Sequence, residues 1–311
     1  PRSVVHGDLV CGPPTFTRAQ LKKNREDLPR ELRTRTLDDD WYRGRSADWS
    51  KVDVPFLSAG NWGGQGLHPR GNIDGFVNAA SQHKWLEMHG REHWTEFYTD
   101  YGLDLQKRFF GHFLKGEDTG WKKQPKVLLN IRHPGEVFVP RTEKEWPLKR
   151  TKWTKAFLEP GTGALATKAP AKKQKSIYAG LGDGVTFLTP ARETAVELTG
   201  PLAAKLFVSS ETKDADLFLV VRLFAPDLKE VTFKGALDPH TPVAQGWLRA
   251  SHRKLDAKKS RRHKPYHSHD EEQLLKPGQV YELDIEVWPT SIVVPPGYRL
   301  GLTVRGTDYV Y

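Results

Sequence analysis

Residues 54–98 carry a strand, a glycine-rich loop, a helix and a second strand in close succession, and this order limits the fold more than any other feature. Short apolar runs at residues 54–59 and 84–88 are each closed by glycine. Such runs are typical of strands that are buried on both faces, as in a parallel sheet. Between them Asn72 can cap a helix over residues 73–83. The segment therefore predicts a right-handed β-α-β unit in an open α/β sheet.

The loops that follow these two strands are the expected place for chemistry. In open α/β sheets, functional groups lie beyond the carboxyl ends of the strands, where residues 60–72 and 89–95 must lie. His93 stands in the second loop, after a buried strand, and is the candidate catalytic histidine. His89 is the alternative, but it lies nearer the end of the strand, where a side chain more often packs.

These residues resemble the CocE/NonD-type α/β-hydrolases, which include cocaine-esterase-like acyl hydrolases, α-amino-acid ester hydrolases and Xaa-Pro dipeptidyl-peptidases. The segment DDDWYRGRSADWSKVDVPFLSAG is similar to the family's return from a helical cap into the sheet. The loop that ends in His93 is similar to the loop that bears the family's catalytic histidine. Four further segments resemble the family in order and spacing: FFGHFLKG at residues 109–116, EWPL at 145–148, LRASHR at 248–253 and GYRLGLT at 297–303.

The resemblance implies a serine hydrolase of small acyl esters, amides or Xaa-Pro peptides that acts through an acyl-enzyme. The family's nucleophile is a serine in a G-x-S-x-G-like turn, and the 311 residues contain no such pattern. The family places that serine before its cap, whereas this chain starts at Pro1 and has Met88 as its single methionine. We therefore expect a fragment that is inactive alone and needs the missing N-terminal half of the hydrolase domain as its partner.

The resemblance aligns the family's catalytic aspartate with Gly63 or Gly64, so either another group replaces it in orienting the histidine or activity is weak. Asp74 is the candidate, since with Asn72 as cap it would lie in the first helical turn at the active edge of the sheet. Glu92, beside the histidine, is the rival. The structural alternative is that Asp74 complements the helix dipole and Glu92 is solvated.

Three regions are expected along the chain: the end of a helical cap at 1–50, the C-terminal part of an α/β-hydrolase domain at 51–120, and a β-sandwich at 121–311. The fold class is thus α/β plus all-β, and the resemblance implies a jelly-roll, galactose-binding-like sandwich truncated at its end. Helices are expected at 18–27, 28–34 and 103–114, and strands of the sandwich at 127–131, 137–139, 194–199, 203–209, 217–224, 280–287 and 300–304. The second functional hypothesis is a non-catalytic binding module for a glycan or peptide.

Composition narrows the classes of partner. The net charge of +10 draws on lysine- and arginine-rich runs at 258–264 and 172–175, but neither carries a known nucleic-acid-binding motif, so nucleic acid is not expected. The His/Asp/Glu cluster at 267–272 lacks zinc-ligand spacing, and neither a metal nor another cofactor is expected. No apolar run approaches the ~20 residues of a membrane span. The single cysteine, Cys11, favours a reducing, cytoplasmic location, and a homo-oligomer is left open.

Overall fold

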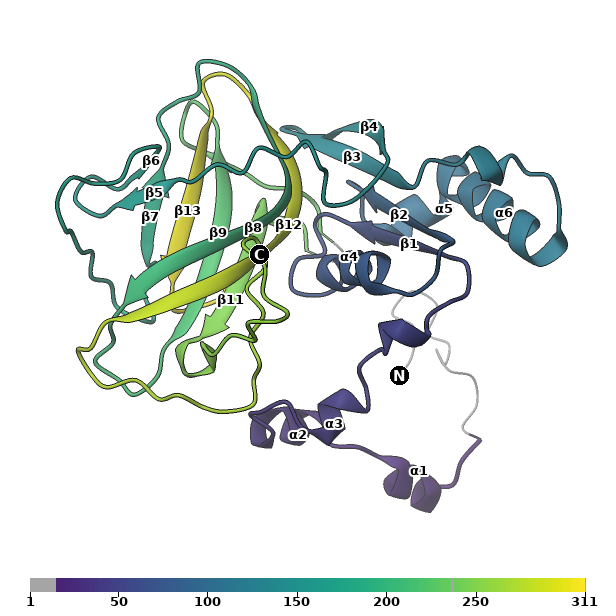
Figure 1. The fold of residues 1–311 in the computed structure, drawn as a ribbon, viewed down its shortest axis with the longest axis horizontal. Coiled ribbons are helices and arrows are strands. Elements are labelled where there is room, and N and C mark those ends of the chain that lie inside the picture. Colours follow the sequence, from purple (N-terminus) through teal and green to yellow (C-terminus); the bar gives the residue numbers. More distant parts are fainter. Residues whose placement is uncertain (1–14, 236–237, 311) are drawn as a thin grey trace. The chain divides into compact units, whose positions relative to one another are not determined.

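The structure is a computed structural model that describes residues 15–235 and 238–310, except for the side chain of His93. Cys11 lies outside the described residues. The chain forms two compact units, residues 1–45 and residues 46–311 (Figure 1). Each unit is described by itself below.

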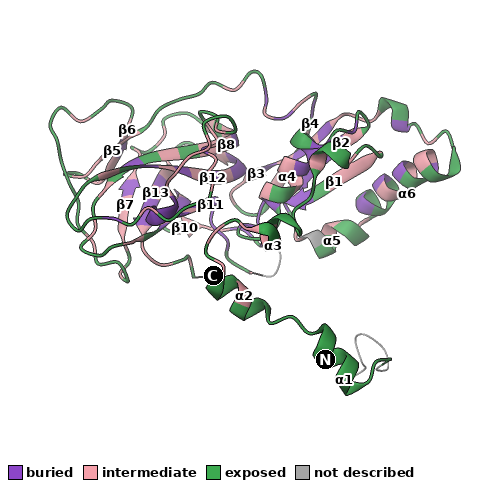
Figure 2. Cartoon of the chain, turned by 60° about the horizontal axis from the view of Figure 1, so that its bottom comes forward, coloured by how far each residue is buried: buried purple, intermediate pink, exposed green. Residues whose placement is uncertain are grey.

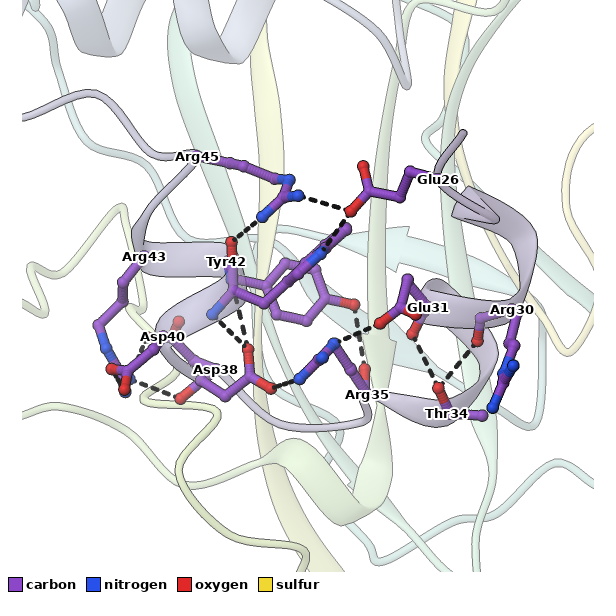
Figure 3. Close-up of polar contacts among 12 residues, drawn as sticks. Glu26, Arg30, Glu31, Thr34, Arg35, Asp38, Asp40, Tyr42, Arg43 and Arg45 are labelled. Carbon is purple, nitrogen blue, oxygen red and sulfur yellow. Dashed lines mark hydrogen bonds and ion pairs between the residues drawn. The ribbon is translucent and has the colours of Figure 1, made fainter. Parts of the chain in front are cut away.

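The first unit contains three short helices, α1 (Arg18–Asn24), α2 (Leu28–Thr34) and α3 (Asp40–Arg43). Thr17 closes a capping box with Gln20 at the start of α1, as a capping threonine is expected to do. None of the three helices buries a residue, and Figure 2 shows α1 and α2 as exposed. The described contacts of this unit are mainly ion pairs (Figure 3). The Arg35 guanidinium lies 2.6 Å from the carboxylates of both Glu31 and Asp39. The described part of this unit, residues 15–45, is therefore held mainly by local charge pairs.

In the second unit the β-α-β segment is present. The 3-10 turn η1 (Trp49–Lys51) precedes strand β1 (Phe56–Asn61). Strand β1 pairs in parallel with β2 (Lys84–His89), and helix α4 (Pro69–Asn78) connects the two strands. Ile73 and Phe76 of α4 pack on Leu86 and Met88 of β2, so α4 covers one face of the two strands (Figure 1). The expected strands and the intervening helix are confirmed.

Helix α4 begins earlier than predicted. Its first residue is Pro69, its N-cap is His68 and it ends at Asn78, so Asn72 lies inside the helix and caps nothing. Proline is favoured at the first helical position, where its fixed φ suits the helix and its missing N–H has no partner to lose. Asp74 therefore lies in the second turn and not the first. The side chain of Asn72 instead donates to the carbonyl oxygen of Ala59 at 3.0 Å and ties α4 to β1.

The other face of the sheet is covered by α6 (Asp100–Lys115), which follows the short helix α5 (His93–Tyr98) (Figure 1). Trp85 of β2 packs with Leu105 and Phe109 of α6, next to the turn η2 (Trp121–Lys123). The hydroxyl of Thr99 accepts from the Gly102 backbone N–H at 3.1 Å and caps α6. The long amphipathic helix predicted near residues 103–114 is confirmed.

Two strands expected in the sandwich belong to the sheet of β1 and β2. Strand β3 (Val127–His133) runs parallel to β2, with Leu86 opposite Val127, and β4 (Val137–Glu143) pairs antiparallel with β3. Strand β3 follows α6 and so completes a second β-α-β crossover, which places it beside β2. The alternating pattern of residues 127–139 alone did not distinguish the two sheets.

The described part of the sandwich consists of two sheets packed around one core. Strand β12 extends the first sheet through Ile292, opposite Arg132 of β3, and pairs antiparallel with β8, giving the order β1-β2-β3-β12-β8. The second sheet has the order β10-β9-β13-β7-β6-β5, with β11 against β9. Their elements are β5 (Phe157–Glu159), β6 (Ala164–Ala166), β7 (Val185–Leu188), β8 (Val196–Val208), β9 (Asp216–Phe224), β10 (Glu230–Val231), β11 (Ala244–Arg249), η3 (Ala250–His252), β12 (Tyr281–Val294) and β13 (Arg299–Arg305).

The core between the sheets combines side chains such as Leu283 and Ile285 of β12 with Leu219 of β9 and Leu248 of β11. It appears as the buried interior of the sandwich in Figure 2. The two strands predicted at 194–199 and 203–209 are one strand, β8, because it pairs with β12 along its length and the irregularity is absorbed between Val287 and Thr290. A sandwich of two sheets is thus present; its jelly-roll topology and its likeness to galactose-binding modules stay predictions.

Candidate active site

The carboxyl ends of β1 and β2 lie side by side. Asn61, the last residue of β1, stands opposite His89, the last residue of β2. The backbone N–H of Trp62 donates to the carbonyl oxygen of His89 at 3.0 Å, and the Trp62 indole donates to the carbonyl oxygen of Asn130 at 2.8 Å. The loops that leave the two strands therefore begin together at one edge of the sheet, as the β-α-β segment predicted.

Alternation along β2 decides which face carries polar groups. Leu86 and Met88 point to α4, so Trp85, Glu87 and His89 point to the opposite face, toward α5 and α6. Trp85 fills the apolar part of that face. Glu87 and His89 continue the same row toward the carboxyl edge of the sheet.

Glu87 and His89 form a buried pair. The Glu87 Oε2 atom lies 2.7 Å from the His89 Nδ1 atom, and the two residues are 1% and 4% exposed. Burial raises the pKa of Glu87 above its ordinary value, and the hydrogen bond from His89 opposes this shift. Among the described residues, Glu87 Oε1 and His89 Nε2 have no hydrogen-bond partner, and neither does the side-chain amide of Asn61. The edge of the sheet thus holds an acid–base pair with unused hydrogen-bonding atoms.

The loop after β1 has no room for the family's aspartate. A Cβ atom on Gly63 would lie 2.4 Å from the carbonyl oxygen of Lys234, and one on Gly64 would lie 2.6 Å from Oδ1 of Asn61. The same loop is fixed to the sandwich by Gln65, whose side-chain oxygen accepts from the backbone N–H of Gln245 at 3.3 Å. Glycine at position 63 is therefore a packing requirement between this loop and the sandwich, whereas the space at Gly64 is limited by Asn61 and Pro69 within the β1–α4 segment itself.

The predicted base, His93, is the first residue of α5, four positions beyond the end of β2. Its imidazole lies outside the described side chains, so its role stays a prediction. Glu92, the N-cap of α5, makes no capping hydrogen bond; its carboxylate accepts from the Thr95 hydroxyl at 3.3 Å and lies 4.0 Å from Lys234 Nζ.

Asp74 is engaged by cations. Its carboxylate is paired with the ammonium of Lys264 and lies 3.7 Å from Arg70 Nη1, and its side chain is 19% exposed. Arg70 in turn donates to Glu286 of β12 at 2.9 Å. These contacts bind α4 to the sandwich. Whether Asp74 also meets the imidazole of His93 is not described, and that prediction also stays open.

Sequence reasoning did not single out Glu87. Its signal was present: Glu87 is the one carboxylate in KWLEMH, where it stands between the apolar residues Leu86 and Met88 in a strand that is buried from Trp85 to His89. A carboxylate at a position that alternation buries is costly unless it is paired, which marks it for attention.

Other features contribute little to this site. Among the described residues, no three His, Cys, Asp or Glu side chains are grouped so that they could hold a metal ion. Over the same residues, no helix is both long and apolar enough to cross a membrane. A pocket of about 560 Å³ opens beside β4, but its lining residues come from positions 125–150 and not from β1 or β2.

Residues 119–311 match the family described as the X-Pro dipeptidyl-peptidase C-terminal non-catalytic domain. The cocaine esterase of Rhodococcus sp. (strain MB1 Bresler) is 24% identical over 243 residues, which is 66% of this chain and 38% of the esterase. A putative Xaa-Pro dipeptidyl-peptidase of Rhodopirellula baltica is 24% identical over 226 residues, covering 67% of this chain and 33% of that protein.

A solved structure extends the similarity over nearly the whole chain. The crystal structure of a CocE/NonD family hydrolase from Staphylococcus aureus aligns with a TM-score of 0.88 and 31% identity, covering 92% of this chain and 52% of that one. The chain therefore spans about a third of the length of the two curated relatives and about half of this solved structure.

Proposed function

Over residues 119–311 the chain belongs to the family of X-Pro dipeptidyl-peptidase C-terminal non-catalytic domains, and from this premise we propose that it acts as the histidine-bearing half of a serine hydrolase. The resemblance to CocE/NonD hydrolases is confirmed. The relatives named above are an esterase and a putative peptidase, and they suggest acyl esters, amides or Xaa-Pro peptides as substrates.

One observation carries the proposal: the similarity to a CocE/NonD hydrolase is not confined to the sandwich but reaches into residues 1–118, the part of the chain in which the buried Glu87–His89 pair lies. It covers 92% of the chain, whereas the non-catalytic family begins only at residue 119. A histidine that is held by a carboxylate is the core of nucleophilic acyl transfer, because it can take the proton of an attacking hydroxyl.

In the proposed reaction, a serine supplied by the N-terminal half of the hydrolase attacks the carbonyl carbon of the substrate. His93 removes the hydroxyl proton and later gives it to the leaving alcohol or amine. Asp74 is the carboxylate that the sequence proposes for orienting the imidazole. The residues of this chain supply base and carboxylate, and the partner half supplies nucleophile and oxyanion donors.

The test compares the 311-residue chain with the full-length protein. We expect the full-length protein to release p-nitrophenol from an activated ester in a burst and to be labelled on serine by a fluorophosphonate, with one label per active site. The chain alone should show neither, since it lacks a serine nucleophile motif. Stoichiometric serine labelling of the 311-residue chain, or no hydrolysis by the full-length protein, would overturn the proposal.

A second candidate is a binding module for a glycan or peptide, and the description of residues 119–311 as non-catalytic favours it. Isothermal titration of the 311-residue chain with oligosaccharides and with Xaa-Pro peptides distinguishes the two. Saturable binding by the chain, together with an inactive full-length protein, would favour the module.

A further inference from the structure

We infer that Glu87 is the carboxylate of the acid–base machinery and that it acts through His89 as a positioning residue. The inference rests on the proposed hydrolase function and deepens it. It moves the acid from the loop after β1, where the family carries it, into the interior of β2.

The loop after β1 cannot supply the carboxylate. The close approach of Gly63 to the Lys234 carbonyl leaves no space for an acidic side chain at that position, and Gly64 is closed by Asn61 and Pro69. Any carboxylate that serves this edge of the sheet must therefore come from a different element.

Three carboxylates remain as candidates, and their surroundings differ. Asp74 is paired with Lys264 and Arg70, and two cations take up its charge. Glu92 is partly exposed, with its side chain at 29%, and it borders the ammonium of Lys234. The described contact of Glu87, by contrast, is with an imidazole nitrogen at 2.7 Å, within the range of a strong charge-assisted hydrogen bond.

Burial of the Glu87 carboxylate costs free energy. Glu87 stands on the face of the sheet where Trp85 and Leu105 pack, and a leucine or valine would suit such a position. Placing a carboxylate there carries a desolvation penalty that a single hydrogen bond does not fully offset. Glu87 Oε1 remains without a partner among the described residues. A carboxyl group retained under these conditions is more readily explained by a chemical role than by stability.

The contact with Glu87 fixes the tautomer of His89. With Nδ1–H donated to Glu87, the ring is fixed in one tautomer, and the lone pair of Nε2 is left as an acceptor. Nε2 is buried and has no partner among the described residues, so bulk water does not satisfy it. We assign this lone pair to the catalytic base: it accepts an N–H of the base, and the charge of Glu87 stabilises the cation that forms when the base takes up a proton.

Titratable neighbours of Glu87 lie in α5 and α6. Glu96 of α5 acts on Glu87 and raises its pKa, and the pKa of Tyr101 in α6 is raised by burial and by the charges of Glu87 and Glu96. Arg108 of α6 acts in the opposite direction on Tyr101. Glu96 therefore offers a matched control, because it places a carboxylate near the same pair without contacting His89.

The experiment uses the full-length protein with the variants Glu87→Gln, Glu87→Asp, His89→Gln and Glu96→Gln. We expect kcat for an activated ester to fall about 100-fold in Glu87→Gln and His89→Gln, with KM changed little, which lies below the ~10⁴-fold loss for a carboxylate in direct contact with the base. Glu87→Asp should recover part of the loss, and Glu96→Gln should stay within a few-fold of wild type.

The pH profile separates a positioning role from a structural one. Removal of the negative charge at Glu87 disfavours the protonated base, so the acidic limb of kcat/KM should move to lower pH in Glu87→Gln. A variant that keeps the wild-type kcat and the wild-type limb overturns the inference and leaves the proposed hydrolase intact.

A measurement on the unmodified protein covers the case in which Glu87→Gln does not fold. Nitrogen-15 spectra of histidine-labelled protein should show His89 at neutral pH as a neutral ring with the proton on Nδ1 and a strongly downfield N–H resonance. A proton on Nε2 would overturn the inference. Full-length protein that hydrolyses no ester or peptide, yet shows the expected tautomer, would instead count against the proposed function.

Discussion

The backbone of Gly63 passes so close to that of Lys234 that a Cβ atom on the glycine would lie 2.4 Å from the lysine carbonyl oxygen and 2.7 Å from the Cα atom of Gly235. The loop after β1 and the segment after β10 therefore touch through their main chains. This contact joins the candidate active site to the sandwich and explains why the family's aspartate has no counterpart at this position.

Gly63→Ala should accordingly destabilise the chain. The added methyl group meets backbone atoms that cannot rotate away, and overpacking of this kind costs about 1–3 kcal/mol. Gly71 gives a control of opposite sign: it lies in α4, where a Cβ atom would meet no neighbouring group within 4 Å, and alanine there should add about 0.5–1 kcal/mol. Urea unfolding of both variants measures the difference, and equal stabilities would contradict the contact.

His93→Ala in the full-length protein should abolish the burst of alcohol from an activated ester while leaving the far-ultraviolet spectrum and the melting temperature unchanged. The reason is that the proposed base alone removes the proton of the nucleophile. His112→Ala is the control, since His112 lies in α6 and faces the carbonyl oxygen of Glu117 at 3.3 Å. A His93 variant that retains most of its turnover would remove this residue from the proposal.

Asp74→Asn separates catalysis from stability. The contacts of Asp74 with Lys264 and Arg70 predict a loss of about 1.5–3 kcal/mol of stability, the usual contribution of a hydrogen bond to a charged group. If Glu87 supplies the carboxylate, kcat should stay within a few-fold of wild type. A fall of several orders of magnitude would instead support the assignment that the sequence suggested for Asp74, and it would argue against Glu87.

The strands, helices and edge of the sheet could be predicted from the sequence because they depend on local patterns. Apolar runs set β1 and β2, and threonine caps set α1 and α6. The start of α4 was misplaced because a capping asparagine was given more weight than Pro69 at the first helical position. Strand β3 was expected among the sandwich strands alone, but it also runs parallel to β2, because pairing partners are not encoded locally.

In the candidate site, too, the features that depend on local patterns could be predicted and the long-range contacts could not. The edge on which it lies was predictable, because parallel strands end together. The contact of Gly63 with Lys234 joins segments far apart in the chain, and no local pattern reports it. Glu87 was overlooked because one charged residue in a short strand was not weighed against the burial on both faces that its apolar neighbours predict. The packing of α6 against Trp85 shows that this face is buried.

Substitution of Arg132 should reduce the stability of the chain. This fully buried residue of β3 donates from Nε to the Ser291 carbonyl at 2.9 Å and from Nη2 to the Val243 carbonyl at 2.7 Å, and its guanidinium lies 4.6 Å from the centre of the Phe233 ring. Burial lowers its pKa to about 9.

Arg132→Lys keeps a positive charge but removes the planar fork that reaches both carbonyls, so we expect a loss of about 2–4 kcal/mol. Arg262→Lys, at an exposed position, should change stability by less than about 0.5 kcal/mol. Guanidinium unfolding of the two variants provides the measurement. Equal midpoints would show that the fork does not join β3 to the sandwich.

His267 makes stability depend on pH. Its Nε2 atom is 2.9 Å from the carbonyl oxygen of Asp284, to which it donates, and burial together with the charge of His269 lowers the pKa of the His267 ring to about 4. The ordinary pKa of histidine, near 6.5, applies in the unfolded chain. The unfolded state therefore binds more protons between pH 6.5 and about 4, so this contribution is fully present above pH 6.5 and is lost as the pH falls through that window.

His267→Gln keeps a side-chain donor for the Asp284 carbonyl but does not titrate. The variant should therefore lose less stability than the wild-type chain between pH 7 and pH 4.5, and the two unfolding free energies should converge or cross as the pH falls. His240→Gln, at an exposed histidine, should follow the wild-type curve. Parallel curves for wild type and His267→Gln across this range would show that the ring is not held neutral by its surroundings, since a histidine that titrates equally in both states contributes no pH dependence.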